Sequence, residues 1–175
     1  RSIFHSGVPL SLSSSQEMKE FLKTVSIFRD LPDSEIEKLL SMVTEKECAD
    51  NHVIFNENDH GKTIFVVKSG SFRLFMSGQK MADFNSGDVF GELALINDNL
   101  RSGKVMANGP GVLFEIRGAD LVDPSKINPS SSLNIIRVLA RQVTAYLKPQ
   151  SFTSTTELIK SGETDRVEFK SSLRY

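Results

Sequence analysis

Apolar residues in the first part of the chain are spaced as they are on helices. Between residues 16 and 43 they recur at intervals of three and four, which places side chains on one face of an α-helix. The pattern predicts a short helix over 16–24 and a second helix after Pro32. Ser34 followed by Glu37 favours a capping box at the start of that second helix. Its apolar face comprises Ile36, Leu39, Leu40 and Val43.

From about residue 48 to residue 117 the apolar spacing shortens to that of β-strands. Residues 72–76 and 112–117 alternate between two faces, and residues 64–67 form the short apolar run of a buried strand. Turn sequences containing glycine separate these runs. Three asparagines, which tolerate positive φ, lie in other predicted turns: Asn51, Asn58 and Asn85. Several short strands at this spacing favour a barrel or jelly roll over a parallel α/β sheet.

A longer helix is predicted over residues 131–148, where Pro149 ends it. One of its apolar stripes has the three-four spacing of a coiled-coil seam, and a weaker stripe runs beside it. Because two stripes need two surfaces, we expect one to face the barrel and the other a second subunit, which predicts a homodimer. The alternative is a single wide stripe that faces the core. The seam comprises Leu133, Ile136, Ala140, Val143 and Leu147, and the weaker stripe Ile135, Leu139 and Tyr146.

Composition places the chain among ordinary folded domains. It has 175 residues, of which 39% are hydrophobic and 25% charged, and its net charge of −1 favours neither nucleic acid nor an anionic membrane as a partner. The lone Cys48 and the lack of a membrane-spanning run or signal peptide predict a cytoplasmic location. We expect a loose arm over 1–15, one domain over 16–148, and a linker with a further segment over 149–175.

The residues between Gly87 and Ser102 suggest binding chemistry. Gly91 permits close backbone approach, and the run from Glu92 to Ile96 is long enough for about one helical turn with free N–H groups. Arg101 lies nine positions after Glu92 and offers a planar fork of donors suited to a phosphate. The Glu92 carboxylate only accepts hydrogen bonds, so a ligand hydroxyl suits it. A ligand with a hydroxyl close to a singly charged phosphate would satisfy both residues.

This stretch resembles the phosphate-binding cassette of the cyclic-nucleotide-binding domain family, as found in catabolite-activator proteins and protein-kinase-A regulatory subunits. The run from Phe90 to Leu95 reads F-G-E-L-A-L, and Arg101 is followed by Ser102, in the family's order and spacing. The likeness extends over about residues 25–148. It implies a mainly β fold: a double-stranded β-helix (jelly-roll) barrel with N-terminal helices and a C-terminal lid or dimer helix.

The resemblance also implies roles for individual residues. Glu92 would bind the ribose 2′-hydroxyl and Arg101 a phosphate oxygen. The backbone around Leu93 and Ala94 would complete the cradle, and Ser102 could bind the phosphate or a purine edge. Arg141 and Tyr146 on the last helix are candidate lids over the base. The full predicted ligand-binding set is Phe90, Gly91, Glu92, Leu93, Ala94, Arg101, Ser102 and Gly103.

The predicted function is therefore that of a regulatory module for signal transduction. Cyclic AMP is favoured over cyclic GMP as the ligand, and binding would move the last helix and regulate an attached or partner effector. Six positions depart from the family: Asn51, Asn58 and Asn85 replace glycines, Lys62 replaces an acid, and Gly103 and Lys104 follow the Arg-Ser pair. The alternative is a degenerate roll that serves as a ligand-free dimerisation scaffold.

Catalysis and metal binding are not expected. Jelly-roll barrels also house metal enzymes, but the histidines of this chain are only His5, His52 and His60, without a His-x-His pair. The sequence also has no Ser-His-Asp constellation, Cys-His pair or phosphate-binding loop of the Walker type.

The end of the chain carries a separate resemblance. Gly162-Glu163, followed by the run from Val167 to Leu173, is similar to the opening of the AlbA-like domain of Schlafen proteins. That likeness implies a nucleic-acid partner through a truncated domain. The alternatives are a charged tail or a lone strand.

Overall fold

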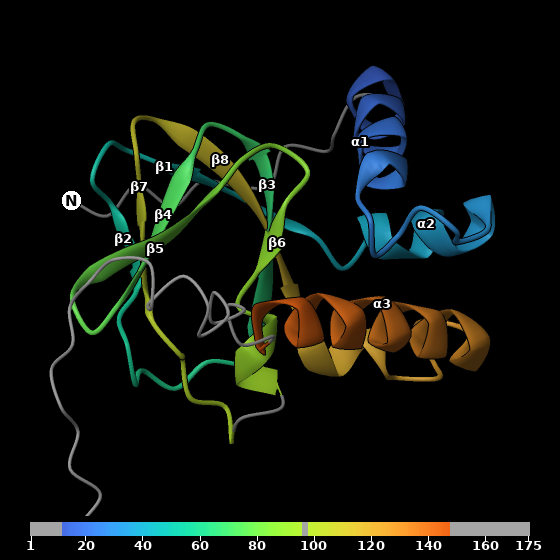
Figure 1. Ribbon diagram of the computed structural model, residues 1–175. Helices are drawn as coiled ribbons and strands as arrows, with labels where there is room; N and C mark the ends of the chain where they lie inside the picture. Colours follow the sequence, from blue (N-terminus) through green and yellow to red (C-terminus); the bar gives the residue numbers. More distant parts are fainter. Residues whose placement is uncertain (1–11, 96–97, 148–175) are drawn as a thin grey trace, which may run out of the picture.

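The computed structural model describes residues 12–95 and 98–147, which form a β-roll with a group of helices beside it (Figure 1). The helices are α1 (Leu12–Thr24), α2 (Asp33–Leu40) and α3 (Pro129–Leu147), and two 3₁₀ turns are η1 (Glu92–Leu95) and η2 (Gly118–Leu121). The strands are β1 (Thr44–Cys48), β2 (Val53–Phe55), β3 (Thr63–Ser69), β4 (Phe72–Met76), β5 (Gln79–Phe84), β6 (Val89–Phe90), β7 (Lys104–Ala107) and β8 (Gly111–Arg117).

The strands form two four-stranded antiparallel sheets, in the orders β1-β8-β3-β6 and β2-β7-β4-β5. This architecture confirms the predicted jelly roll. The predicted strands over 64–67, 72–76 and 112–117 lie in β3, β4 and β8. Neighbouring strands within each sheet are mostly far apart in the sequence, so the roll is held by long-range pairing.

Strand β3 is apolar on both faces because each face borders a different core. Ile64 and Val66 belong to a cluster shared with the helices, whereas Phe65 and Val67 belong to the cluster inside the roll. Successive side chains of a strand point to opposite faces, so a continuous apolar run is needed where both faces are covered. The helices therefore pack on the outer face of the β3-β8 sheet.

The N-terminal helices differ from the predictions at their starts. Helix α1 begins at Leu12, so the last residues of the expected loose arm are helical; residues 1–11 lie outside the described part of the chain. The predicted capping box is wrong. The N-cap of α2 is Pro32, without a side-chain cap, and because the helix starts at Asp33, Ser34 lies inside its first turn. Glu37 instead binds Lys19 of α1 at 2.7 Å.

Two of the three predicted asparagine turns adopt the left-handed backbone. Asn51 has φ of 59° and Asn58 has φ of 67°, as expected. Asn85 also lies in a turn, since the Asp88 N–H donates to its carbonyl at 2.9 Å, although its φ is not positive. In that turn Gly87 takes the left-handed conformation with φ of 90°, and the Asn85 N–H donates to Asp88 at 2.8 Å.

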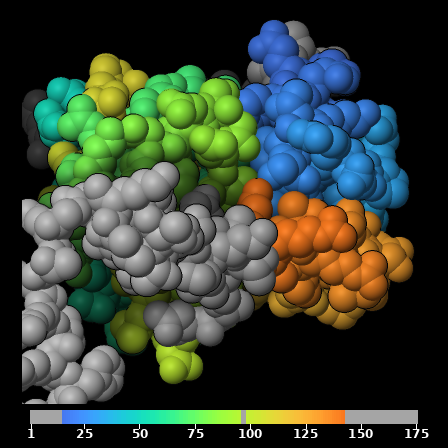
Figure 2. All heavy atoms as spheres, in the orientation of Figure 1, coloured from blue at the N-terminus to red at the C-terminus, as the bar shows by residue number. Residues whose placement is uncertain are grey.

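Helix α3 lies beside α1 and α2 on one side of the roll (Figure 1 and Figure 2). Ile135 is 1% exposed and packs in the helical core with Leu139, whereas Leu133 and Ile136 are 47% and 46% exposed. Among the described side chains, the weaker stripe thus faces the core, whereas Leu133 and Ile136 of the seam do not, so the alternative of one wide core-facing stripe is wrong for this part of the helix. The side chains beyond residue 142 lie outside the described part of the chain.

Candidate functional site

The cassette begins where the last short strand ends. Phe90 is 2% exposed and stacks with Phe65 and Phe84, at ring-centroid distances of 5.2 and 4.9 Å. Gly91 follows with φ of 84°, and a Cβ there would lie 2.8 Å from Arg101 Nη1. Both the backbone and the space around it therefore require glycine. The anchored ring and the glycine turn fix where η1 starts.

Turn η1 carries the predicted cradle residues. It runs from Glu92 to Leu95, as the prediction of a single turn requires. Glu92 is 6% exposed and Ala94 is 1% exposed, while Leu93 is partly buried. The first N–H groups of such a short turn have no partner within the turn, so they are available to an acceptor.

Arg101 is buried beside this turn. Its side chain is 4% exposed, and Nη1 donates to the carbonyl oxygens of Thr63 and Gly91 at 2.9 and 2.8 Å. Its Cζ lies 4.3 Å from the centre of the Phe55 ring. The Nε atom is buried and has no hydrogen-bond partner among residues 12–95 and 98–147. Since buried N–H groups are nearly always paired, this one indicates a place for an acceptor that the described residues do not supply.

The backbone around Arg101 is tied to the loop after β2. The Arg101 N–H donates to the Asp59 carbonyl at 2.9 Å, and the Asn58 N–H donates to the Arg101 carbonyl at 2.8 Å. Two residues further along the first loop, the Gly61 N–H donates to the Asn99 carbonyl at 2.8 Å. The two loops therefore hold the root of the arginine side chain in place.

Burial shapes the charges of the site. Removal from water raises the pKa of Glu92, and its own backbone N–H and the nearby Arg101 charge partly offset this effect. Burial likewise lowers the pKa of Arg101, against the opposing influence of Asp59 and Glu92. Neither Glu92 nor Arg101 forms an ion pair with another side chain within 12–95 and 98–147. The two buried groups thus carry opposite charges that influence one another without forming an ion pair.

The remaining predicted site residues are described mainly by their burial and their position in the fold. Ser102 is partly buried, and Gly103 is packed so closely on β4 that a Cβ would lie 2.6 Å from the Phe75 carbonyl oxygen. Arg141 is exposed on α3. The side chain of Tyr146 lies outside the described residues, so its predicted lid role stays a prediction.

Sequence reasoning missed residues that surround the guanidinium. Phe55 supplies a ring face, Thr63 a backbone carbonyl, and a Cβ on Gly61 would overlap the guanidinium itself. These positions precede Arg101 by about forty residues, and no local pattern links them to it.

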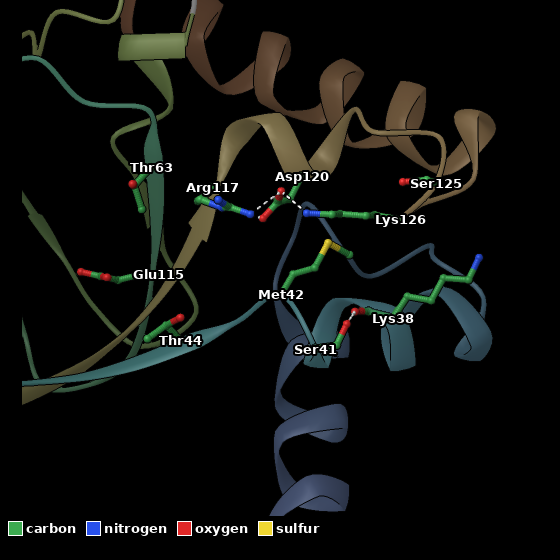
Figure 3. Close-up of a pocket in the computed structure, with 10 residues that line it drawn as sticks. All are labelled: Lys38, Ser41, Met42, Thr44, Thr63, Glu115, Arg117, Asp120, Ser125 and Lys126. Atoms are coloured by element: carbon green, nitrogen blue, oxygen red, sulfur yellow. Dashed lines mark hydrogen bonds and ion pairs between the residues drawn. The ribbon is translucent and has the colours of Figure 1, made fainter. Parts of the chain in front are cut away.

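A hollow lies outside the roll, between α2, β8 and the segment that leads to α3 (Figure 3). It has a volume of about 740 Å³ and is lined by Lys38, Ser41, Met42, Thr44, Thr63, Glu115, Arg117, Asp120, Ser125 and Lys126. Its charges are largely paired: Asp120 binds both Arg117 and Lys126, at 2.9 and 2.6 Å. The cassette residues are absent from this lining, and only Thr63 also contacts Arg101.

Comparison with known proteins shows what the chain is similar to. Residues 45–123 match the family model described as "Cyclic nucleotide-binding domain". The chain is 31% identical over 109 residues to the cGMP-dependent protein kinase egl-4 of Caenorhabditis briggsae, which covers 59% of this chain and 15% of the kinase. The chain thus spans less than two thirds of that relative.

Solved structures share the fold. The regulatory domain of Toxoplasma gondii PKA with cAMP superposes with a TM-score of 0.65 at 22% identity, over 75% of this chain and 50% of that one. The regulatory subunit of a cAMP-independent protein kinase A from Trypanosoma brucei gives a TM-score of 0.63 at 19% identity, over 87% and 52%.

In its roll, its cassette and residues 45–123, the chain is similar to cyclic nucleotide-binding domains. No helix within 12–95 and 98–147 is long and apolar enough to cross a membrane. The same residues contain no group of three or more side chains that could hold a metal ion.

Proposed function

We propose that the roll binds a purine cyclic monophosphate, with cAMP preferred, and that the ligand completes the hydrogen bonding of Arg101. The observation that carries the proposal is the buried Arg101 Nε, which has no hydrogen-bond partner in the part of the chain that the structure describes. A phosphate oxygen is an acceptor of the right charge for it. Glu92, buried close by, would accept from the ribose 2′-hydroxyl.

The test is calorimetric titration of the protein with cAMP and cGMP side by side. Arg101→Ala should weaken binding by about 2–3 kcal/mol, on the order of a hundredfold, because a charge-assisted hydrogen bond is lost and a phosphate is left unmatched. Arg29→Ala is the matched control, since Arg29 is exposed near the helices. Unchanged affinity of Arg101→Ala would contradict the proposal. The nucleotide that binds with the higher affinity identifies the preferred ligand.

Coupling to α3 would run through the segment between β8 and that helix. Leu95 of η1 packs against Gly118, where an added Cβ would lie 2.9 Å from Leu95 Cδ1. A shift of η1 on ligand binding would therefore press on the start of η2, from which the chain continues to α3. The ligand can move α3 only by its differential affinity for two positions of that helix. Through α3 the module would regulate an attached or partner effector.

The second candidate function is a scaffold without a ligand. It is supported by the contacts that Arg101 already makes, since two backbone carbonyls accept from its Nη1. The trypanosome neighbour, described as cAMP-independent, has the same fold. A protein that gives no heat with either nucleotide, and carries none when purified, would favour this function over ligand binding.

We also propose that the exposed seam of α3 pairs two copies of the chain. Leu133 and Ile136 are both nearly half exposed on one face of the helix. Ile136→Asp should convert a dimer to a monomer in sedimentation analysis, whereas Arg137→Asp, on the neighbouring exposed position, should not. A monomeric wild-type protein would contradict the pairing.

The nucleic-acid partner proposed for residues 149–175 rests on the resemblance of Gly162-Glu163 and the run from Val167 to Leu173. These residues lie outside the described part of the chain. Filter binding of single- and double-stranded nucleic acid to the full chain, and to a chain ending at residue 148, tests it. Equal weak binding by both would contradict it.

A further inference from the structure

Arg101 is held by an aromatic ring as well as by hydrogen bonds. Its Cζ lies 4.3 Å from the centre of the Phe55 ring and 5.5 Å from that of Phe65. Rings attract a guanidinium at such distances, and the attraction is stronger where water is excluded. Since Arg101 is 4% exposed, water is largely excluded here.

The Phe55 ring is itself fixed in place. It lies at the end of β2, and its centroid is 5.8 Å from that of Phe65 and 6.0 Å from that of Phe90. Phe90 belongs to the cassette and stacks with further rings inside the roll. The surface on which Arg101 rests is thus the outermost part of a packed aromatic cluster.

Hydrogen bonding alone leaves the guanidinium incompletely fixed. Both of its side-chain hydrogen bonds to the described residues use the same atom, Nη1, which donates to the carbonyls of Thr63 and Gly91. The two N–H groups of Nη1 lie in the guanidinium plane, so they orient that end of the group, whereas Nε has no hydrogen bond to the described residues. A ring against the flat face supports the rest of the plane, which decides where Nε points.

We infer that Phe55 is a positioning residue that orients the guanidinium of Arg101 for an anionic ligand. Phe55 acts through Arg101 and need not touch the ligand. The ring holds the plane of the guanidinium, so that the unpartnered Nε keeps its direction before the ligand arrives. The effect on affinity rests on the proposed function, whereas the orientation of Arg101 does not.

The test compares Phe55→Leu with Phe55→Tyr and Phe84→Leu. Leucine keeps an apolar side chain but removes the ring, and tyrosine restores the ring. Phe84→Leu is the matched control, because Phe84 stacks on Phe90 in the same cluster at 4.9 Å and lies outside the ring contacts of Arg101. Circular dichroism and thermal melting establish that each variant is folded.

The first measurement is the ¹⁵N–¹H resonance of Arg101 Nε in the ligand-free protein, assigned by its loss in Arg101→Lys. The ring current of Phe55 should displace this resonance in the wild type, in Phe55→Tyr and in Phe84→Leu, and in Phe55→Leu the displacement should fall to the smaller one that the Phe65 ring produces. An unchanged resonance in folded Phe55→Leu would overturn the inference. So would the same change in Phe84→Leu.

The second measurement is affinity for cAMP and cGMP by titration. Phe55→Leu should bind about tenfold more weakly, the size expected for one buried contact between a cation and a ring. Phe55→Tyr should restore most of the loss, and Phe84→Leu should stay near wild type. Wild-type affinity in Phe55→Leu would overturn the inference. If the wild type itself binds neither nucleotide, the proposed function fails, and the resonance still decides the role of Phe55.

Discussion

Arg101 carries a buried charge whose position depends on small neighbours. A side chain on Gly61 would overlap the guanidinium, and Gly61 does not have the positive φ that would by itself exclude alanine. Steric overlap with Arg101 is therefore the main cost of a substitution there. A substitution of Gly61 should therefore disturb the candidate binding site more than it strains the backbone.

Gly61→Ala should displace Arg101 and weaken cyclic-nucleotide binding by about tenfold or more, since a charge-assisted contact is lost. Gly87→Ala is the contrasting variant. Gly87 has φ of 90° and no atom within 4 Å of an added Cβ, so alanine there should lower the melting temperature through strain but leave affinity unchanged. Titration and thermal melting of both variants measure this. Intact affinity in Gly61→Ala would show that Arg101 can bind from another position.

Glu92 should make the affinity for cyclic nucleotide depend on pH. Burial raises the pKa of Glu92, and only the ionised carboxylate accepts from a ribose hydroxyl without also presenting a proton. Affinity for cyclic nucleotide should therefore fall as pH is lowered through this raised pKa, above the ordinary value of 4.5. Titrations over a pH series measure the profile. Glu92→Gln should bind more weakly and show a flat profile there, and a wild-type profile that is equally flat would contradict the role of Glu92.

Helix α3 is fastened to the N-terminal helices near both ends. Glu35 of α2 accepts from the Asn128 N–H at 2.7 Å and from Lys38 at 2.8 Å. Further along, Gln142 donates to Ser26 at 2.9 Å. These bonds tie α3 to the segment before the roll, so the helices are expected to move together.

Glu35→Gln should loosen the start of α3. The substitution removes the charge that strengthens the bond from the Asn128 N–H, and the expected loss is about 1–2 kcal/mol in the free energy of unfolding. Amide exchange in the first turn of α3 should also accelerate. Glu37→Gln is the control on the same helix, because the Glu37 side chain is 62% exposed. Equal exchange rates in the two variants would contradict a fastening role for Glu35.

Local patterns explain which elements could be predicted. The run 64–67 and the alternation in 72–76 and 112–117 carry the spacing of strands, and the cassette is contiguous, so both were accessible from the sequence. Glu35 and Asn128 are 93 residues apart, and Gln142 and Ser26 are 116 apart. Contacts at such separations depend on how elements pack, which no local spacing encodes. The contact between Phe55 and Arg101 was missed for the same reason.

The molecule as a whole should be sensitive to acid through its paired carboxylates. The bond from the Asn128 N–H, with help from Lys38, holds the pKa of Glu35 below its ordinary value of 4.5. Lys126 and then Arg117 hold the pKa of Asp120 below 3.8. A carboxylate with a depressed folded pKa adds stability above its unfolded pKa and loses it as pH falls through the folded value. Glu92, with its raised pKa, has the opposite sign.

We therefore expect the free energy of unfolding to begin falling near pH 4.5 and to decline further below pH 3.8. Asp120→Asn should be less stable than the wild type at neutral pH and should lose less stability on acidification. Urea denaturation at a series of pH values measures both. A parallel decline in wild type and variant would contradict the contribution of Asp120.

The pairing of β1 with β8 has a consequence for how the roll can be combined with other sequences. Thr44, where the roll begins, is the register partner of Glu115, two residues before it ends. Partners in an antiparallel ladder have Cα atoms about 4.5–5.5 Å apart. The chain therefore enters and leaves the roll at nearly one point, which is the geometry that permits a domain to be inserted into a surface loop of a host. A host that also covers the outer face of the β3-β8 sheet could in this way carry residues 44–117 as a single unit, and both of its connections to the host would move together.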